Sequence, residues 1–273
     1  MTGWIEVYRG DAPLLVSFPH TGTDLPAEIE PSLRSQWLAR KDADWWIDSL
    51  YEFAVELGAT TVRTPLSRTV VDVNRDPSGA SLYPGRTTTG LCPLETFEGE
   101  PLYRDGAEPD DAEIARRRRL YFDPYHAAIA DELARLRARH EQVVLYDAHS
   151  IRSQLPRLFD GELPHLNIGT YNGVSCAPAL RALASGIAAA SAFSQVLDGR
   201  FKGGWITRHY GRPHEGVHAV QMELAFRAYL DEPSAPVDEG NWPAPFAAER
   251  AAPLRAVLRD ILSACIAFAR GSP

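Results

Sequence analysis

Short, almost entirely apolar runs that alternate with helical segments constrain the fold of this chain more than any other feature. Three of them are LLVSF at 14–18, QVVLYD at 142–147 and VHAVQMEL at 217–224. Runs of this length bounded by turn residues are typical of strands that are buried on both faces of a sheet. The alternation predicts one α/β domain over residues 1–273, with a mixed, mainly parallel sheet and helices on both of its faces.

Weaker patterns place the remaining elements. Segments rich in β-branched or apolar residues predict further strands over 59–64, 69–73, 166–170 and 194–197. Helical spacing predicts helices over 33–57, 110–140, 177–190 and 253–269, the second of them interrupted or kinked near Pro124. The stretch 78–106 is rich in Gly, Pro and Thr, and we expect a long ordered loop or a small subdomain that covers a site.

The charge balance excludes some kinds of partner. The chain has 28 Lys and Arg against 36 Asp and Glu, a net charge of -8, and phosphate binding needs a basic surface. The basic run at 116–119 has acidic neighbours, so a solvated helix face is a better interpretation than a nucleic-acid patch. A small anionic substrate remains compatible if arginines cluster in a pocket. The sequence leaves the oligomeric state open.

Cysteine usage and hydropathy bear on the compartment. The three cysteines are far apart and odd in number, which predicts no disulfide framework. Residues 1–10 have no apolar core segment, and no apolar run approaches the roughly 20 residues that span a bilayer. We therefore expect a cytoplasmic protein without a membrane partner.

Two histidines follow two of the strongest predicted strands. His20 comes after the run at 14–18, and His149 comes after the run at 142–147. Ligand sites in α/β sheets gather beyond the carboxyl ends of the strands, so both imidazoles are candidates for one metal site. Either histidine alone could simply cap its strand through hydrogen bonds, but the pair together favours a metal.

A carboxylate would complete such a site, because hydrolytic zinc commonly takes two histidines, one carboxylate and a water. The candidates are Asp44, Asp42 and Asp24. Asp44 lies beside two tryptophans, where an acidic group needs a reason, although it could be an exposed helix residue or a cap. Asp147, two residues before His149, could orient a ligand or bond to the backbone.

Arginines lie near several predicted strand ends. Asn74 and Arg75 follow the predicted strand 69–73, and an arginine fork with an adjacent amide can bind a carboxylate, although a turn is the alternative. Arg68 lies just upstream, and Arg208 and His209 lie in a glycine-containing segment that permits close approach of a ligand. Together they predict an anion pocket.

Glu223 lies within the apolar run at 217–224. A carboxylate there is costly unless it is paired or functional, so a general base is one interpretation and the exposed end of a strand is the other.

Seven segments in one order resemble the N-formylglutamate amidohydrolase family. They are SFPHTG (17–22), DADWWIDSLYEFA (42–54), SRTVVDVNRD (67–76), TTTGLCP (87–93), DAHSIRSQLPRLFDGELP (147–164), RFKGGWITRHYG (200–211) and HAVQMEL (218–224). The resemblance covers nearly the whole chain. The family is similar to the zinc carboxypeptidase-like hydrolases, which implies a three-layer α/β/α fold with a His, carboxylate and His metal site.

The resemblance also implies roles for individual residues. Zn²⁺, or another divalent ion, is expected on His20, Asp44 and His149, with Glu223 as the base. The related pattern has its metal carboxylate three residues after the first histidine, where this chain has Thr23. Asp44 is therefore the first choice, and Asp24 and Asp42 are the alternatives.

Arg68 is expected to stabilise the oxyanion. Asn74, Arg75, Arg208 and His209 are expected at the substrate carboxylates. The implied reaction is hydrolysis of N-formyl-L-glutamate to formate and L-glutamate, a step of histidine degradation. The alternatives are a deacylase for another N-acyl amino acid or N-formyl peptide, and a metal-free carboxylate-binding protein.

Overall fold

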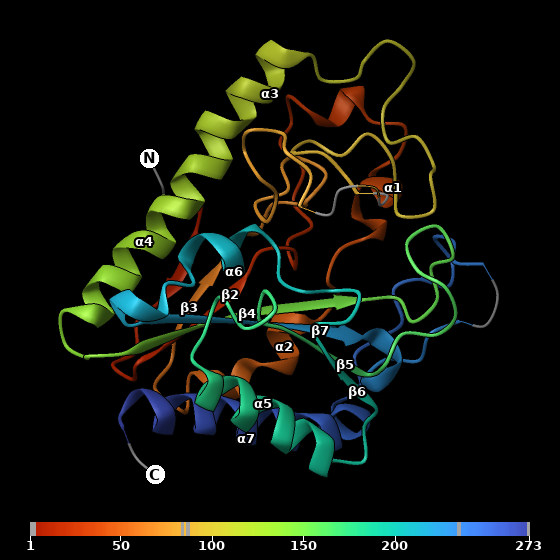
Figure 1. Ribbon diagram of the computed structural model, residues 1–273. Coiled ribbons are helices and arrows are strands. Elements are labelled where there is room, and N and C mark those ends of the chain that lie inside the picture. The colour runs from red at the N-terminus through yellow and green to blue at the C-terminus, as the bar shows by residue number, and fades with distance from the viewer. Residues whose placement is uncertain (1–3, 83–84, 86–87, 234–235, 272–273) are drawn as a thin grey trace.

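The structure, a computed structural model, describes residues 4–82, 85, 88–233 and 236–271. A seven-stranded sheet in the order β1-β3-β2-β4-β7-β5-β6 runs through its centre (Figure 1). The strands are β1 (Glu6–Tyr8), β2 (Leu14–Phe18), β3 (Thr60–Arg63), β4 (Val143–Ile151), β5 (Leu166–Gly169), β6 (Gln195–Leu197) and β7 (Val217–Ala225). Four neighbouring pairs are parallel, and only β1–β3 and β5–β7 are antiparallel. The prediction of a mixed, mainly parallel sheet is confirmed.

Helices cover both faces of the sheet (Figure 1). On one face lie α5 (Pro178–Ala190) and α7 (Ala248–Ala269); on the other lie α3 (Asp111–Arg117), α4 (Asp123–Arg137) and α6 (Trp205–Tyr210). Side chains of β4 alternate between the two apolar clusters, with Val144 and Tyr146 in the α5–α7 cluster and Val143 and Leu145 in the α4 cluster. Every residue of β4 is buried as a result, which explains its continuous apolar sequence.

The helix predicted over 33–57 is wrong as a single element. The structure has two short helices, α1 (Gln36–Lys41) and α2 (Ile47–Leu50), between 3-10 turns at Glu30–Ser32 and Glu52–Ala54. The break has a tertiary cause. The Asp44 amide donates to the His20 carbonyl at 2.9 Å, and Trp46 adopts a left-handed conformation with φ 62°. This bend brings Asp44 to the end of β2.

The strand predicted over 69–73 is also wrong. Those residues form no ladder, although Val70, Val71 and Val73 are buried. The Asp72 amide donates to the Leu91 carbonyl at 2.7 Å, so loop packing, not a sheet, satisfies this segment. Burial of β-branched residues imitates a strand in the sequence.

The long charged helix is interrupted as predicted. A five-residue π-helical segment, Arg118–Phe122, separates α3 from α4, and Pro124 lies in the first turn of α4. Within the basic run, Arg116 and Arg117 both bond to Glu113, which agrees with a helix face. Helix α7 starts at Ala248, five residues before the predicted start.

The stretch 78–106 is a long loop, and its described residues contain neither helix nor named strand. It lies above the carboxyl ends of β2 and β4 (Figure 1). Residues 83, 84, 86 and 87 are outside the described part. No helix that the structure describes combines the length and apolar character of a membrane span.

Candidate metal centre

His20, Asp44 and His149 come together from three separate segments. Each offers one possible ligand atom, and these atoms all lie within 4.8 Å of one another. His20 follows β2 by two residues, and Asp44 sits in the bend after α1. His149 lies inside β4, which runs four residues beyond the predicted strand end at 147. All three side chains are buried.

Both imidazoles turn the same nitrogen toward Asp44. The Asp44 Oδ2 atom is 3.0 Å from His149 Nδ1 and 3.8 Å from His20 Nδ1. Behind them, His20 Nε2 is 2.7 Å from Asp72 Oδ1, and His149 Nε2 is 3.0 Å from Asp147 Oδ2. A carboxylate on the far nitrogen fixes the tautomer and leaves Nδ1 free to bind a metal.

The two supporting aspartates are themselves held in place. Asp72 accepts from Arg68 Nη2 at 2.7 Å and from the Asn74 amide at 3.0 Å. Burial alone would raise the pKa of Asp72, but the charges of Arg75, His20 and Arg68 outweigh burial and hold that pKa well below its usual range. Asp72 therefore stays ionised beside His20.

Asp147 accepts from the Ser17 hydroxyl at 2.5 Å and from Asn74 Nδ2 at 3.0 Å. Both of its oxygens therefore have donors besides His149.

The donor set and its charge fit a divalent cation. Four buried carboxyl groups gather here, and two guanidinium groups, those of Arg68 and Arg75, lie against one of them, Asp72. The four are Asp44, Asp72, Asp147 and Glu223. Two histidine nitrogens and a carboxylate oxygen are the ligands that Zn²⁺ takes in hydrolytic sites.

The alternative carboxylates lie elsewhere. Asp42 accepts a hydrogen bond from the Phe97 amide at 2.6 Å, and burial raises the pKa of its carboxyl to about 6. Asp24 is exposed and forms an isolated bridge with Leu66. Of the three candidates, only Asp44 lies with both histidines.

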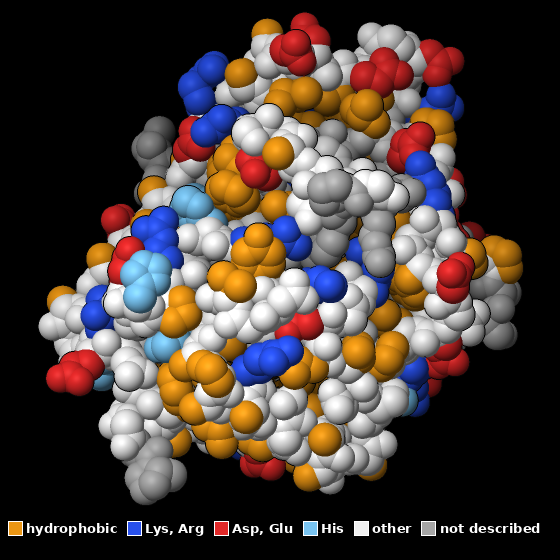
Figure 2. Space-filling view, viewed as in Figure 1, with side chains coloured by type: hydrophobic (Ala, Val, Ile, Leu, Met, Phe, Trp, Pro, Cys, Tyr) orange, Lys and Arg blue, Asp and Glu red, His pale blue; other side chains and the backbone are white. Residues whose placement is uncertain are grey.

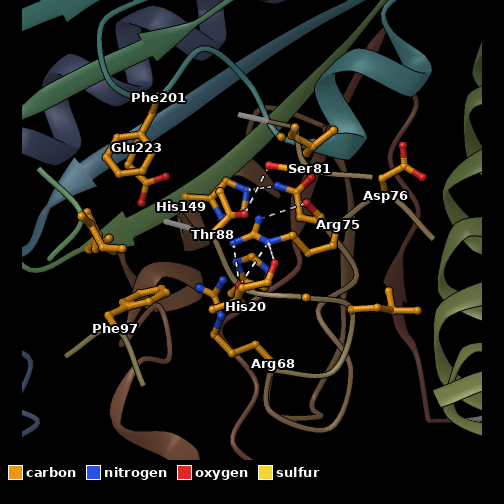
Figure 3. Close-up of a pocket in the computed structure, with 18 of the residues that line it drawn as sticks. His20, Arg68, Arg75, Asp76, Ser81, Thr88, Phe97, His149, Phe201 and Glu223 are labelled. Atoms are coloured by element: carbon orange, nitrogen blue, oxygen red, sulfur yellow. Dashed lines mark hydrogen bonds between the residues drawn. The ribbon is translucent and has the colours of Figure 1, made fainter. Parts of the chain in front are cut away.

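Glu223 lies directly beside His149. The register between β4 and β7 pairs His149 with Glu223 and Asp147 with Gln221, so all four side chains share one face of the sheet. Figure 3 shows the Glu223 carboxyl group next to the His149 ring. Burial raises the pKa of Glu223 to about 8, against the opposing effect of His149. Gln221 Nε2 donates to it at 3.3 Å.

A cavity of about 440 Å³ opens over these groups. His20, His149 and Glu223 form its floor, and segments 79–82, 88–91 and 94–97 of the long loop contribute walls (Figure 3). Arg75 also lines it, held by Thr89 Oγ1 at 3.2 Å from Nε and 3.0 Å from Nη2. Basic side chains gather around the middle of this face (Figure 2).

The other predicted anion-binding residues divide into two groups. Arg68 and Arg75 line the cavity, and so does Asn74. Both ends of the Asn74 amide already have protein partners, because Nδ2 donates to Asp147 and Oδ1 accepts from the Ile206 amide at 2.8 Å. Asn74 therefore has the geometry of a residue that positions Asp147 and α6.

Arg208 and His209 do not join this group. Among the residues that the structure describes, the cavity lining includes neither. Arg208 donates to the carbonyls of Gly203 at 2.9 Å and Leu82 at 2.8 Å. His209 is exposed and stacks on Trp205. Their segment forms α6, and Arg208 is tied through Leu82 to the loop that walls the cavity.

Asp72, Gln221 and Phe97 are site residues that the sequence pattern does not single out. Asp72 lies 52 residues from the histidine that it supports, and Phe97 lies in a loop without periodic pattern. The one available signal was a polar residue within each apolar segment, because both Asp72 and Gln221 interrupt such runs.

The fold and the site together define an α/β protein with a buried candidate metal centre and an adjacent carboxylate at the carboxyl ends of parallel strands. The family model for N-formylglutamate amidohydrolase matches residues 12–230. The chain therefore belongs to the N-formylglutamate amidohydrolase family.

Two curated relatives agree with this assignment, and two solved structures share the fold. The N-formylglutamate deformylase of Pseudomonas aeruginosa is 49% identical over 96% of both chains. That of Pseudomonas putida is 43% identical over 97% of this chain and 96% of its own. An N-formylglutamate amidohydrolase from Ralstonia eutropha shares the fold, with a TM-score of 0.76, 23% identity and coverage of 97% and 98%. A gene product of Agrobacterium tumefaciens has a TM-score of 0.68 at 18% identity, covering 95% of both chains.

Proposed function

We propose that this protein hydrolyses N-formyl-L-glutamate to formate and L-glutamate in a metal-dependent reaction. Family membership and the names of the two curated relatives support the substrate. The observation that carries the mechanism is the buried group of His20, Asp44 and His149 beside the buried Glu223. Zn²⁺ suits these ligands, and Co²⁺, Mn²⁺ and Ni²⁺ are chemically related alternatives. We also propose a cytoplasmic location, which suits three free, buried cysteines.

The metal ligands would be the Nδ1 atoms of His20 and His149 and a carboxylate oxygen of Asp44. When bound, a divalent ion supplies Lewis acidity and makes water a nucleophile at neutral pH. Asp72 and Asp147 hold the two imidazoles in the ligating tautomer, as their bonds to Nε2 require.

Glu223 is the proposed proton carrier. It accepts a proton from the attacking water as the bond from water oxygen to the formyl carbon forms. It then delivers that proton to the amide nitrogen as the carbon–nitrogen bond breaks, which releases formate and the free amine of glutamate. Gln221 orients the Glu223 carboxylate through its 3.3 Å hydrogen bond.

Arginines handle the negative charge in this proposal. Arg68 lies 3.8 Å from Asp44 and lines the cavity, where it can oppose charge that develops on the formyl oxygen. Arg75 presents a guanidinium group to the cavity and would bind a substrate carboxylate through two parallel hydrogen bonds. Asn74 positions the Asp147–His149 pair beside it.

Substrate assays and elemental analysis test this proposal. Purified protein should turn over N-formyl-L-glutamate much faster than N-acetyl- or N-succinyl-amino acids, and it should contain about one divalent ion per chain. His149→Ala should lose that ion. Glu223→Gln should keep the ion but lose roughly 100-fold or more of kcat. Equal turnover of the other acyl substrates would reject the substrate, and metal-free active protein would reject the mechanism.

A further inference from the structure

The cavity has two chemically different ends, one on either side of His149. Side chains at every second position of β4 share a face, so Asp147, His149 and Ile151 line up at intervals of roughly 6–7 Å. Asp147 bonds to Asn74, the neighbour of Arg75, at one end. Ile151 belongs to an apolar cluster that includes Phe97 at the other end.

Figure 3 shows the same separation. Arg75 and Ser81 lie to one side of His149, and Phe97 and Phe201 lie to the other, with Phe201 next to Glu223 and Phe97 nearer to Arg68. The members of the apolar cluster that line the cavity form what we call the apolar wall, and they are Phe97, Ile151, Leu158 and Phe201. One end of the cavity is therefore suited to a carboxylate and the other to a small apolar group.

Phe97 is linked to the candidate metal centre through Arg68. Its ring centroid is 4.7 Å from the Arg68 guanidinium carbon, and Arg68 Nη1 lies 3.8 Å from Asp44 Oδ1. A single guanidinium group thus separates the ring from a proposed metal ligand. A cation is attracted to the face of an aromatic ring, so the Arg68 guanidinium holds the Phe97 ring in place.

The backbone of Phe97 is also anchored. Its amide donates to the buried carboxylate of Asp42 at 2.6 Å. Asp42, which is not a metal ligand candidate in the structure, thus fixes the backbone of Phe97. The next residue, Glu98, forms ion pairs with the buried Lys41 and with Arg152, just beyond β4. Phe97 therefore has a fixed position before any substrate binds, and a fixed wall can exclude a group by size.

We propose that Phe97 limits the size of the acyl group that this enzyme accepts. This inference rests on the proposed function, with a substrate carboxylate on Arg75 and the carbonyl carbon between the candidate metal centre and Glu223. The nitrogen of the scissile bond then leads toward Arg75. The remaining substituent of the carbonyl carbon points to the opposite end of the cavity, toward Phe97. In a formyl group that substituent is hydrogen, and in an acetyl group it is a methyl that meets the ring.

The test compares two substrates on matched variants, each loaded with metal and checked by elemental analysis. We measure kcat/KM for N-formyl-L-glutamate and N-acetyl-L-glutamate with wild-type protein, Phe97→Ala, Phe97→Leu and Phe159→Ala. Phe159 is the control because it packs in the same cluster, with its ring 6.2 Å from Phe201, but does not line the cavity.

The ratio of kcat/KM for the acetyl substrate to kcat/KM for the formyl substrate should rise roughly 10- to 200-fold in Phe97→Ala, because a pocket discriminates one extra methylene by about that factor. The rise should be smaller in Phe97→Leu. The ratio should not change in Phe159→Ala. The Phe97 variants also lose the contact with Arg68. That loss by itself would lower kcat/KM for both substrates equally, so it would not change their ratio. An unchanged ratio in both Phe97 variants overturns this inference, as does a selective rise in KM for the formyl substrate. Failure of wild-type protein to hydrolyse N-formyl-L-glutamate would instead contradict the proposed function.

Discussion

Two aspartates that are two residues apart show how environment decides what a side chain does. Asp44 lies between His20 and His149, whereas Asp42 accepts the amide of Phe97. Their chemistry is identical, but the turn at 42–46 directs one carboxylate to each side of the site. At the residue scale, the role of a carboxylate follows from the donors that meet it.

Thr89 offers a test of how Arg75 is held. Its hydroxyl accepts from Arg75 Nε and Nη2, and its carbonyl accepts from Nε at 3.2 Å. Thr89→Val removes the hydroxyl, so we expect KM for N-formyl-L-glutamate to rise about 10-fold or more with little change in kcat, because one hydrogen bond to a charged group is worth roughly 1.5 kcal/mol or more.

Thr89→Ser should restore the wild-type KM. Thr88→Val is the matched control. Thr88 lines the same cavity, but its hydroxyl pairs with that of Ser81 at 3.4 Å, whereas the hydroxyl of Thr89 pairs with Arg75. Equal KM values for wild type and Thr89→Val would show that Arg75 needs no such support.

His126 predicts a pH dependence of stability. Burial lowers its pKa to about 4, while the unfolded chain has the ordinary value of 6.5. The unfolded state therefore binds more protons between pH 6.5 and 4, and stability from the neutral imidazole is lost as the pH falls through this window. Between pH 7 and 5 the loss amounts to about 2 kcal/mol.

Urea unfolding at both pH values measures this loss. His126→Gln should lose correspondingly less stability on acidification than wild type. His214→Gln, at a side chain 78% exposed, should behave like wild type. Parallel losses in wild type and His126→Gln would reject the assignment to His126.

At the scale of elements, β4 and β7 carry the chemistry because their register aligns it. Asp147 and His149 on one strand face Gln221 and Glu223 on the other. A slip of β7 by one residue would turn Gln221 and Glu223 to the face opposite Asp147 and His149. The helix α6 completes this arrangement from above, since the Ile206 amide in its first turn donates to Asn74.

Gly204, which precedes α6, tests that contact. A Cβ atom there would lie 2.5 Å from the Asn74 amide nitrogen and oxygen, and that amide is held on both sides. Gly204→Ala should displace Asn74 from Asp147 and reduce metal affinity about 10-fold or more, the loss typical for groups that orient metal ligands. A metal-competition titration with a fluorescent chelator measures it.

Gly186→Ala in α5 is the control, because a Cβ there meets nothing within 4 Å. If Gly204→Ala bound metal as tightly as this control, the positioning role of Asn74 would be wrong.

At the scale of the whole molecule, the metal should act as part of the folded structure. Buried carboxylates exceed the arginines beside them, so removing a cation leaves uncompensated negative charge. Ligand that binds only the folded state stabilises it by about 2.7 kcal/mol at 100 times Kd. Chelation should therefore lower Tm by several degrees, and added Zn²⁺ should restore it.

His149→Ala supplies the comparison, because its Tm should not respond to chelator or Zn²⁺. Thermal scans that are the same for wild type with and without metal would contradict a structural contribution of the ion.

Local sequence pattern is sufficient to predict the strands β2, β4 and β7 and the candidates His20, His149 and Glu223. Apolar runs buried on both faces are a local pattern, and so are polar residues that end or interrupt them. Local pattern predicted a strand at 69–73 that does not form. Those residues are buried in a loop, and their composition is like that of a buried strand.

The packing of distant segments places Asp44 beside the histidines and selects the arginines that line the cavity. Asp44 is selected by a bend whose backbone bonds to His20, and Arg208 in α6 bonds to the backbone carbonyls of Gly203 and Leu82. These outcomes depend on contacts between segments far apart in the chain, which no local pattern encodes. The histidines of the candidate metal centre, Asp44 as its first-choice carboxylate and Asp147 as a supporting group were foreseeable, whereas Asp72 and the apolar wall required the fold.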